Sequence, residues 1–394
     1  MAIQSSPVSR PRGAFWNDAG VRGIVYQIVF VGIVVLVGWY LVSNTLANLH
    51  RQNIATGFGF LEREAAFAIG ETPIAYSPAD TYARAFLVGL INTLEVAALG
   101  IVLATILGTM IGVARLSGNW LIRKLTLAYV DTFRNIPLPL QLFFWWAMLR
   151  QAAPGPRQAW NLLPDIFVSN RGVVFPVPEY DPVQPWMALA LAIGAVLTVL
   201  VRRWAKRRQA LTGEQFPSGW VGLALILGLP LTVFVAAGMP FALDRPELKG
   251  FNFVGGHAIS PEFTALLIGL VIYTGAFIAE IVRAGIQAVN WGQSEAAAAL
   301  GLRQGHAMRL VILPQALRVI VPPVTSQYLN LTKNSSLGVF IGYPELVSIA
   351  DTTMNQTGQA IEGITIIMAV YLTISLTISA GMNLYNRAVA LPER

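Results

Sequence analysis

The sequence has no cysteine and little charge. Of its 394 residues, 12% are charged and 55% are hydrophobic, whereas a soluble domain carries about 25% charged residues. The lack of cysteine excludes disulfide frameworks, iron–sulfur clusters and thiolate zinc sites. Only three histidines are present (His50, His257 and His306), and they lie far apart in the sequence, so we expect no metal site. These deficits predict a membrane protein.

The number of membrane spans is estimated from apolar stretches of about 20 residues, each long enough to cross a bilayer as a helix. The first, from Ile24 to Val42, has 19 residues without a charged side chain, which is too long for a cleaved signal peptide. We therefore predict an all-α integral membrane protein with about eight transmembrane helices: Ile24–Val42, Phe86–Ala114, Ile136–Leu149, Pro185–Val201, Ser218–Leu243, Phe263–Val282, Val319–Gly342 and Gly363–Asn386.

The distribution of Lys and Arg predicts the orientation. With the N-terminus in the cytoplasm and eight spans, 18 of the 27 Lys/Arg residues fall inside and eight outside, with Lys333 in a span. Cytoplasmic loops of membrane proteins carry such an excess. The clearest signal is RRWAKRR, Arg202 to Arg208, directly after the fourth span. We expect a multi-pass protein of a bacterial inner membrane with both termini cytoplasmic.

The predicted inner loop 284–314 contains SEAAAALGLRQGHAMRLVILP, from Ser294 to Pro314. Ser294 is a good N-cap, with Glu295 in the first helical turn and four alanines behind it. Gly301 is placed to end this helix in a left-handed conformation, and a second short helix should end near Pro314. An alanine-faced helix has little area to bury in its own subunit, but it lets another surface approach closely.

The spacing in this loop is Glu-Ala-Ala, three residues, Gly301, nine residues, Val311, one residue, and Leu-Pro. This pattern resembles the EAA loop of ATP-binding-cassette importer permeases, with Val311 in place of the family's Ile. The chain also resembles the polar amino-acid uptake branch of that family in four stretches: NTLEVAALGIVLATILGTMIGVAR, YVDTFRNIPLPLQLFF, AFIAEIVRAGIQAVNWGQSEAA and LTKNSSLGVFIGYPEL. Its three additional spans make it similar to the general L-amino-acid permease subunits.

The resemblance implies a five-helix type I importer core, interrupted by an insertion. It divides the chain into an N-terminal helix and periplasmic segment (1–85), a first part of the core (86–150), an inserted segment with two extra helices (151–260), and a second part of the core (261–394). Within the insertion we expect the segment from Gln151 to Pro185 to be an irregular periplasmic cap, and we expect a surface helix within residues 55–83.

In the family this loop couples the permease to a separate ATPase. The resemblance assigns coupling to Ser294, Glu295, Ala296, Ala297, Gly301, Leu302, His306 and Arg309. Glu280 and Arg283, three apart on a helix, either brace this loop or only pair with each other. His306 and Arg309 either contact the ATPase or are simply solvated. The sequence has no G-x-x-x-x-G-K-[ST] phosphate loop, so we expect no enzyme activity here and no bound cofactor, with ATP and Mg held by partner subunits.

Charged and polar residues inside spans are candidates for a substrate pathway, because a charge in the membrane usually faces a cavity or a partner. Glu95 and Lys333 either form an ion pair or lie beside the substrate's charged groups. The candidates are Glu95, Asn330, Lys333, Asn334, Ser335 and Ser336. By contrast, Gly100, Ala104, Gly108 and Gly112 recur every fourth residue and predict close helix packing.

The function expected is therefore the permease subunit of an ATP-driven L-amino-acid importer working by alternating access. Its expected partners are an ATPase dimer, a second permease subunit (a paralogue in preference to a second copy) and a periplasmic amino-acid-binding protein, within membrane lipid and without nucleic acid. The alternative is a gradient-driven secondary amino-acid transporter, a class that often shows inverted repeats. We find no convincing repeat.

Overall fold

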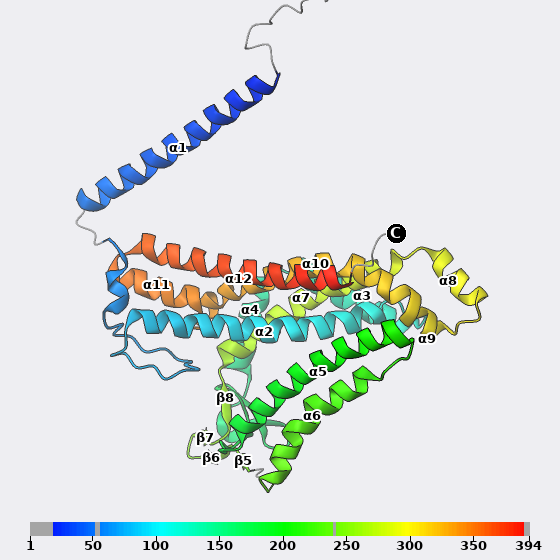
Figure 1. Cartoon of the computed structure of the whole chain (residues 1–394). Coiled ribbons are helices and arrows are strands. Elements are labelled where there is room, and N and C mark those ends of the chain that lie inside the picture. Colours follow the sequence, from blue (N-terminus) through cyan, green and yellow to red (C-terminus); the bar gives the residue numbers. More distant parts are fainter. Residues whose placement is uncertain (1–18, 52–55, 239–241, 390–394) are drawn as a thin grey trace, which may run out of the picture. The chain divides into compact units, whose positions relative to one another are not determined.

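The computed structural model describes residues 19–51, 56–238 and 242–389, and it is mostly helical (Figure 1). Arg10, Arg12 and Arg394, which entered the charge count, lie outside these residues. The α-helices are α1 (Ala19–Arg51), α2 (Tyr82–Ala114), α3 (Trp120–Asn135), α4 (Leu138–Ala147), α5 (Gln184–Thr212), α6 (Ser218–Ala236), α7 (Pro261–Gln287), α8 (Trp291–Ala299), α9 (Gln304–Ala307), α10 (Leu313–Asn334), α11 (Leu346–Thr357) and α12 (Ala360–Val389).

Seven helical segments among the described residues are long and apolar enough to cross a membrane, where the sequence predicts eight. They are Gly20–Thr45, Tyr82–Ala114, Gln184–Thr212, Ser218–Ala236, Pro261–Gln287, Gln304–Ile341 and Ala360–Asn386. The membrane-protein class is therefore confirmed.

The stretch predicted as the third span, Ile136–Leu149, is helical from Leu138 onward, because α4 continues directly into a π-helical turn, Met148–Ala152, but this helix is shorter than the seven spans. It contains α4, of 10 residues, which follows the 16-residue α3 after a break at Ile136 and Pro137. Ile136 is extended (φ −90°, ψ 125°), a conformation that the ring of the following Pro137 favours over the helical one. Both α3 and α4 pack on α7: the Tyr129 hydroxyl donates to the Ile272 carbonyl (2.7 Å).

The described residues form two compact units, the first from the chain up to Gly89 with Ile349–Thr373, and the second from Leu90–Ser348 with the chain from Ile374 onward. In the first, the predicted surface helix is instead a 3-10 helix of five residues, Phe58–Glu62. The backbone of Gly57 joins this segment to the start of α12: its N–H donates to Glu362 Oε1 (2.6 Å), and its carbonyl accepts from Gln359 Nε2 (3.0 Å).

The second unit is built around α7, the most buried of the seven spans. Its core includes Leu142 of α4, Leu266 and Ile278 of α7, and Leu331 of α10, all buried. The predicted small-residue stripe of α2 packs against these helices. A Cβ at Gly112 would lie 2.6 Å from the Ala279 carbonyl oxygen, so the prediction of close packing is confirmed.

The inserted segment is more ordered than predicted. In place of an irregular cap it forms a four-stranded antiparallel sheet in the order β1-β2-β3-β8, with strands Trp160–Leu163, Ile166–Ser169, Gly172–Phe175 and His257–Ile259. Two further pairs are β4–β5 (Val177–Pro178 and Leu243–Asp244) and β6–β7 (Glu247–Lys249 and Asn252–Val254). The sheet joins the first and last parts of the insertion.

Helices α5 and α6, which follow β4 and precede β5 in the sequence, form an antiparallel hairpin (Figure 1). Small residues allow their backbones to approach closely: a Cβ at Gly194 would lie 2.5 Å from the Leu225 carbonyl oxygen. The Thr198 hydroxyl is bonded to the Gly194 carbonyl (2.7 Å) and the Gly222 carbonyl (3.1 Å). Such small-residue contacts are typical of helix pairs inside membranes.

Candidate functional site

The helix α8 carries the residues predicted to couple the chain to an ATPase, but it begins earlier than predicted. Asn290 is its N-cap, and Asn290 Oδ1 accepts from the Gly292 N–H (2.8 Å). The prediction of Ser294 as N-cap is therefore wrong, because Trp291–Gln293 extend the helix by one turn. Glu295 consequently lies in the second turn, where its Oε1 accepts from Trp291 Nε1 (2.9 Å).

The end of α8 is as predicted. Gly301 has φ +73°, the left-handed conformation that glycine adopts without steric cost. Its N–H bonds the Ala298 carbonyl (2.9 Å), and the Leu302 N–H bonds the Ala297 carbonyl (3.1 Å), which together make a Schellman motif. The turn fixes the direction in which the chain leaves the helix.

The predicted second short helix does not stop near Pro314. After α9 the chain passes through a π-helical turn, Met308–Ile312, directly into α10. Pro314 lies in the first turn of α10, directly after this π-helical turn, and does not end the helical segment. His306 and Arg309 are exposed on this continuous segment.

The surface of α8 is largely uncovered within this chain. Trp291 is 75% exposed and Leu300, at the other end, is 80% exposed, whereas Ala297 is 3% exposed. Ala296, like Glu295, is exposed, and Ser294 is half-buried. The helix thus presents alanine backbone between two large apolar side chains.

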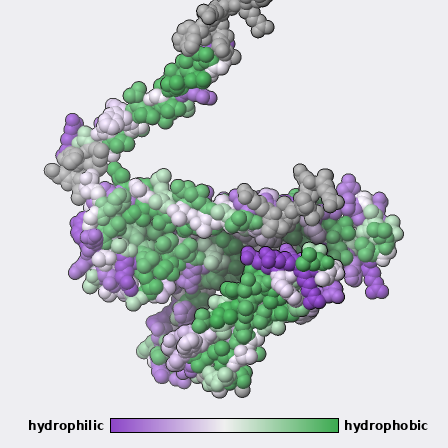
Figure 2. Space-filling model, in the orientation of Figure 1, coloured by the Kyte–Doolittle hydropathy of each residue, from purple (hydrophilic) through white to green (hydrophobic). Residues whose placement is uncertain are grey.

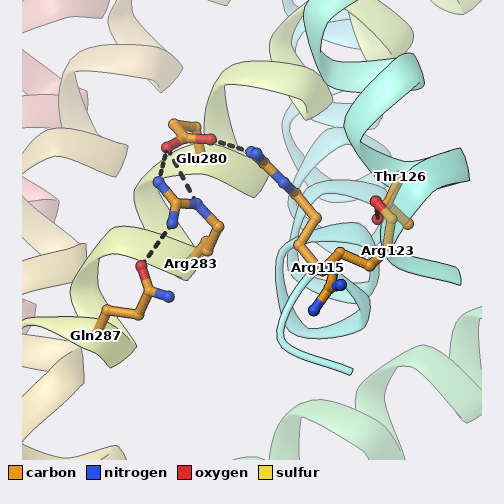
Figure 3. Close-up of polar contacts among 6 residues, drawn as sticks. All are labelled: Arg115, Arg123, Thr126, Glu280, Arg283 and Gln287. Carbon is orange, nitrogen blue, oxygen red and sulfur yellow. Dashed lines mark hydrogen bonds and ion pairs between the residues drawn. The ribbon is translucent and has the colours of Figure 1, made fainter. Parts of the chain in front are cut away.

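A charged network connects α2 to α7 near the start of this loop (Figure 3). Glu280 lies between two guanidinium groups: it accepts from Arg283 Nε (3.1 Å) and from Arg115 Nη1. Arg283 Nη1 also donates to Gln287 Oε1 at 2.5 Å. The Glu280–Arg283 pair is therefore present, and Arg115, which follows α2, is a third member that sequence analysis missed.

The pathway candidates are only partly brought together. Glu95 on α2 and Asn330 and Lys333 on α10 are all exposed. Among the described residues, no ion pair joins Glu95 to Lys333. The described part of the chain therefore does not show the ion pair between Glu95 and Lys333 that was one of the two alternatives.

The three residues after Lys333 mark the end of α10. Asn334 is its last residue, and a 3-10 helix, Ser335–Ile341, follows. The Ser335 and Ser336 hydroxyls donate to the Thr332 and Lys333 carbonyls (both 2.7 Å). Because Ser335 is fully buried, its side chain serves the helix end.

Several buried polar residues near this helix end were not predicted. Asn92 Nδ2 donates to the Pro344 carbonyl (2.9 Å), and the Thr93 hydroxyl accepts from the Leu346 N–H (3.1 Å). The buried Glu345 accepts from the N–H groups of Val347 and Ser348 and begins α11. The only sequence signal was the pair Asn92-Thr93 within an apolar run.

The chain was compared with known protein families and curated proteins. Residues 100–390 match the family model described as "Binding-protein-dependent transport system inner membrane component". The chain belongs to this family. The matched range contains the α8–α9 loop, the Glu280 network and the inserted hairpin.

Three similar relatives extend over nearly the full chain. The general L-amino acid transport system permease protein AapQ of Rhizobium johnstonii is 48% identical, covering 100% of this chain and 99% of the relative. The putative amino-acid ABC transporter permease protein YhdX of Escherichia coli is 51% identical, with 95% of each covered. The glutamate/glutamine/aspartate/asparagine transport system permease protein BztB of Rhodobacter capsulatus is 43% identical, with 100% of each covered. The similarity to these relatives therefore extends over the inserted segment that the sequence predicted.

Proposed function

We propose that this chain is the transmembrane permease subunit of an ATP-binding-cassette importer for L-amino acids. The observation that carries the proposal is the exposed helix α8, ended by the Schellman turn at Gly301 within a family of binding-protein-dependent transport components. The substrate class comes from the printed names of the relatives, of which two name amino-acid transport in general and one names glutamate, glutamine, aspartate and asparagine.

The chain's connections explain how α8 would transmit force. Three residues separate the end of α7 at Gln287 from the start of α8 at Trp291. On the other side, a continuous helical segment runs from Gln304 to Ile341. A displacement of α8 would therefore move two helices of the core, and the Glu280–Arg115 contact would carry the movement to the end of α2.

The partner subunits follow from this role. An ATPase dimer would grip α8 and hold ATP and Mg, and this chain would bind no cofactor of its own. A second permease subunit, which we propose is a paralogue, would complete the pathway, and a periplasmic binding protein would deliver the amino acid. We place the chain in a bacterial inner membrane with both termini and the α8–α9 loop in the cytoplasm, on the basis of the Lys/Arg distribution.

In the transport cycle, closure of the ATPase dimer would push on α8 and open the cavity toward the outside, and hydrolysis would reset it. Glu95, Asn330 and Lys333 are the exposed candidates for contact with the substrate's charged groups. Asn334 and Ser336 are the neighbouring polar candidates. Ser335 is less suited to contact the substrate than these candidates, because its side chain is buried and donates to a carbonyl of its own helix.

Reconstitution in vesicles tests the proposal. The chain is purified with its partner permease and ATPase, and uptake of radiolabelled amino acids is measured with binding protein outside and ATP inside. We expect uptake that needs ATP and persists when ionophores collapse all ion gradients. Uptake that continues without ATP but stops with the ionophores would instead establish a gradient-driven carrier. Because the native chain has no cysteine, single engineered cysteines with impermeant reagents would test the orientation.

A further inference from the structure

The basic run on α5, Arg202 to Arg208, supports the predicted orientation of the chain but has no other role in the function proposed above. All five of its cations are exposed. Four of them, Arg202, Arg203, Lys206 and Arg207, are defined here as the basic patch. They recur at spacings of three and four residues, which place them side by side on one helix surface. Within the described residues, none of the four takes part in an ion pair.

The fifth cation, Arg208, is used differently. It pairs with Glu214 (2.6 Å) in the turn between α5 and α6, and its guanidinium lies 5.6 Å from the centre of the Trp204 ring. Trp204 in turn contacts Phe216 edge to face (5.2 Å). Arg208 thus stabilises the end of the hairpin. The residues of the basic patch lie on another face of α5 and form no ion pair among the described residues.

An exposed apolar stripe leads along α5 to the basic patch. Leu189, Val196 and Leu200 are 49%, 60% and 53% exposed, and they continue at helical spacing into Arg203 and Arg207. Leu189 and Leu200 are 11 residues apart, about 16 Å along a helix, which is close to one leaflet of a bilayer core of about 30 Å. Figure 2 shows hydrophobic residues along the hairpin and hydrophilic residues at this end.

The neighbouring end of α6 has the side chains of a membrane interface. Trp220 is 77% exposed and Leu211, in the last turn of α5, is 87% exposed. Exposed tryptophans of membrane proteins gather at the level of the lipid headgroups. On a hairpin whose second helix carries an exposed tryptophan near its start, an apolar stripe of one leaflet's length ends in four cations that form no ion pair among the described residues. This arrangement matches a phospholipid with an anionic headgroup.

We propose that the basic patch and the apolar stripe of α5 form a binding site for an anionic phospholipid of the inner leaflet. The phosphate and any further headgroup anion would bind the four cations, and one acyl chain would lie along Leu189, Val196 and Leu200. Lys/Arg clusters directly beside a spanning helix attract anionic lipids in this manner. The site does not depend on the transport function, and its placement in the inner leaflet rests on the orientation proposed above.

The test uses the full-length chain in detergent micelles with native mass spectrometry. Phosphatidylglycerol and phosphatidylcholine with identical acyl chains are titrated separately, and the ratio of their dissociation constants is measured. We expect wild type to prefer phosphatidylglycerol. R203Q/R207Q should reduce that preference by about 25-fold, at about fivefold for each cation removed, and R202Q/R203Q/K206Q/R207Q should abolish it.

Two control variants make the test specific. R202K/R203K/R207K keeps the charge and should keep the preference. R171Q/R245Q/K249Q removes three exposed cations from the β-strand region and should also keep it. Near-wild-type thermal stability would show that the fold is intact. Labelling of Gln215→Cys from the same side of the membrane, with and without the other substitutions, would show that the topology is intact.

Three results would overturn the proposal. The first is a lipid preference in R203Q/R207Q within twofold of wild type. The second is an equal loss in the variant of the β-strand region, which would mean a general charge effect. The third is an unchanged lipid preference together with lost association of the ATPase, which would make the basic patch a protein-docking surface.

Discussion

Gly108 of α2 and Ile278 of α7 approach so closely that a Cβ on Gly108 would lie 2.6 Å from the Ile278 Cβ. The Gly275 carbonyl oxygen would lie 2.8 Å from the same atom. Neither contact can be relieved by rotating a side chain, because the Gly275 oxygen belongs to the backbone and the Ile278 Cβ is bonded directly to its Cα. The two helices can therefore pack in this way only with glycine at position 108.

A first prediction concerns this contact. Gly108→Leu should lower the free energy of unfolding by about 3 kcal/mol, the upper end of the range for overpacked cores, or prevent folding. The control is Ala98→Leu, at an exposed position of the same helix, which should be tolerated. Thermal unfolding in detergent would measure both. Equal stability of the two variants would show that α2 and α7 do not meet at Gly108.

A second prediction concerns Glu280, whose carboxylate lies between two guanidinium groups. Glu280→Gln should destabilise the chain by about 1–2 kcal/mol, because it weakens charge-assisted hydrogen bonds at a side chain that is 26% exposed. We expect the bond between α2 and α7 to weaken and transport to slow with it.

The control for Glu280 is Glu247→Gln, which removes a pair with Lys249 (3.6 Å) whose side chains are 71% and 65% exposed. Exposed pairs contribute about 0–1 kcal/mol, so this variant should behave as wild type. Chemical unfolding of both proteins gives the comparison. If Glu280→Gln were as stable as Glu247→Gln, the network would have no structural role.

A third prediction concerns the turn after α8. At Gly301 no atom lies within 4 Å of the position of a Cβ, so Gly301→Leu should not clash within this chain. It should instead strain the left-handed backbone by about 1–2 kcal/mol and place a bulky side chain on the docking surface. We expect normal membrane insertion with ATP-driven uptake lost.

Gly301→Asn separates the two effects, because asparagine tolerates the left-handed conformation better than other residues with a side chain. It should retain more uptake than Gly301→Leu. Uptake and the membrane content of the protein are measured together. Full uptake by Gly301→Leu would remove this turn from the coupling mechanism.

A fourth prediction concerns Glu295. Glu295→Lys should abolish ATP-driven transport while leaving insertion intact, because it reverses the charge on the exposed face of α8 and removes the acceptor for Trp291 Nε1. Glu295→Gln keeps an acceptor at that position and should retain part of the activity. Vesicle uptake with co-purification of the ATPase measures the effect. Wild-type transport by Glu295→Lys would contradict the docking assignment.

A fifth prediction concerns Glu95 and Lys333. Since both are exposed and no ion pair joins them in the described chain, Glu95→Gln and Lys333→Met should each change stability by less than about 0.5 kcal/mol. Their effects on stability should also be additive. Lys333→Met should nevertheless lower uptake. A coupling energy above about 1 kcal/mol in the double mutant would show that the two residues do pair.

Much of the fold follows from local signals. The apolar runs, the small-residue stripe of α2 and the left-handed Gly301 were all predicted, because each depends on neighbouring residues in one segment. The start of α8 was predicted wrongly although it is also local. Asn290 and Ser294 are both good N-caps, and the choice between them depends on Trp291–Gln293, which carry no signal that excludes a helix.

The remaining features depend on residues distant in the sequence. The Arg115–Glu280 contact joins positions 165 residues apart, and β3 pairs with β8 across the whole inserted hairpin. Neither partner carries a local mark of the other. The composition and periodicity of the sequence by themselves determined a multi-helix membrane protein with a bare helix in one loop, because burial in lipid demands long apolar segments. Only the tertiary structure decided which charges meet, since that depends on helix packing that no single segment encodes.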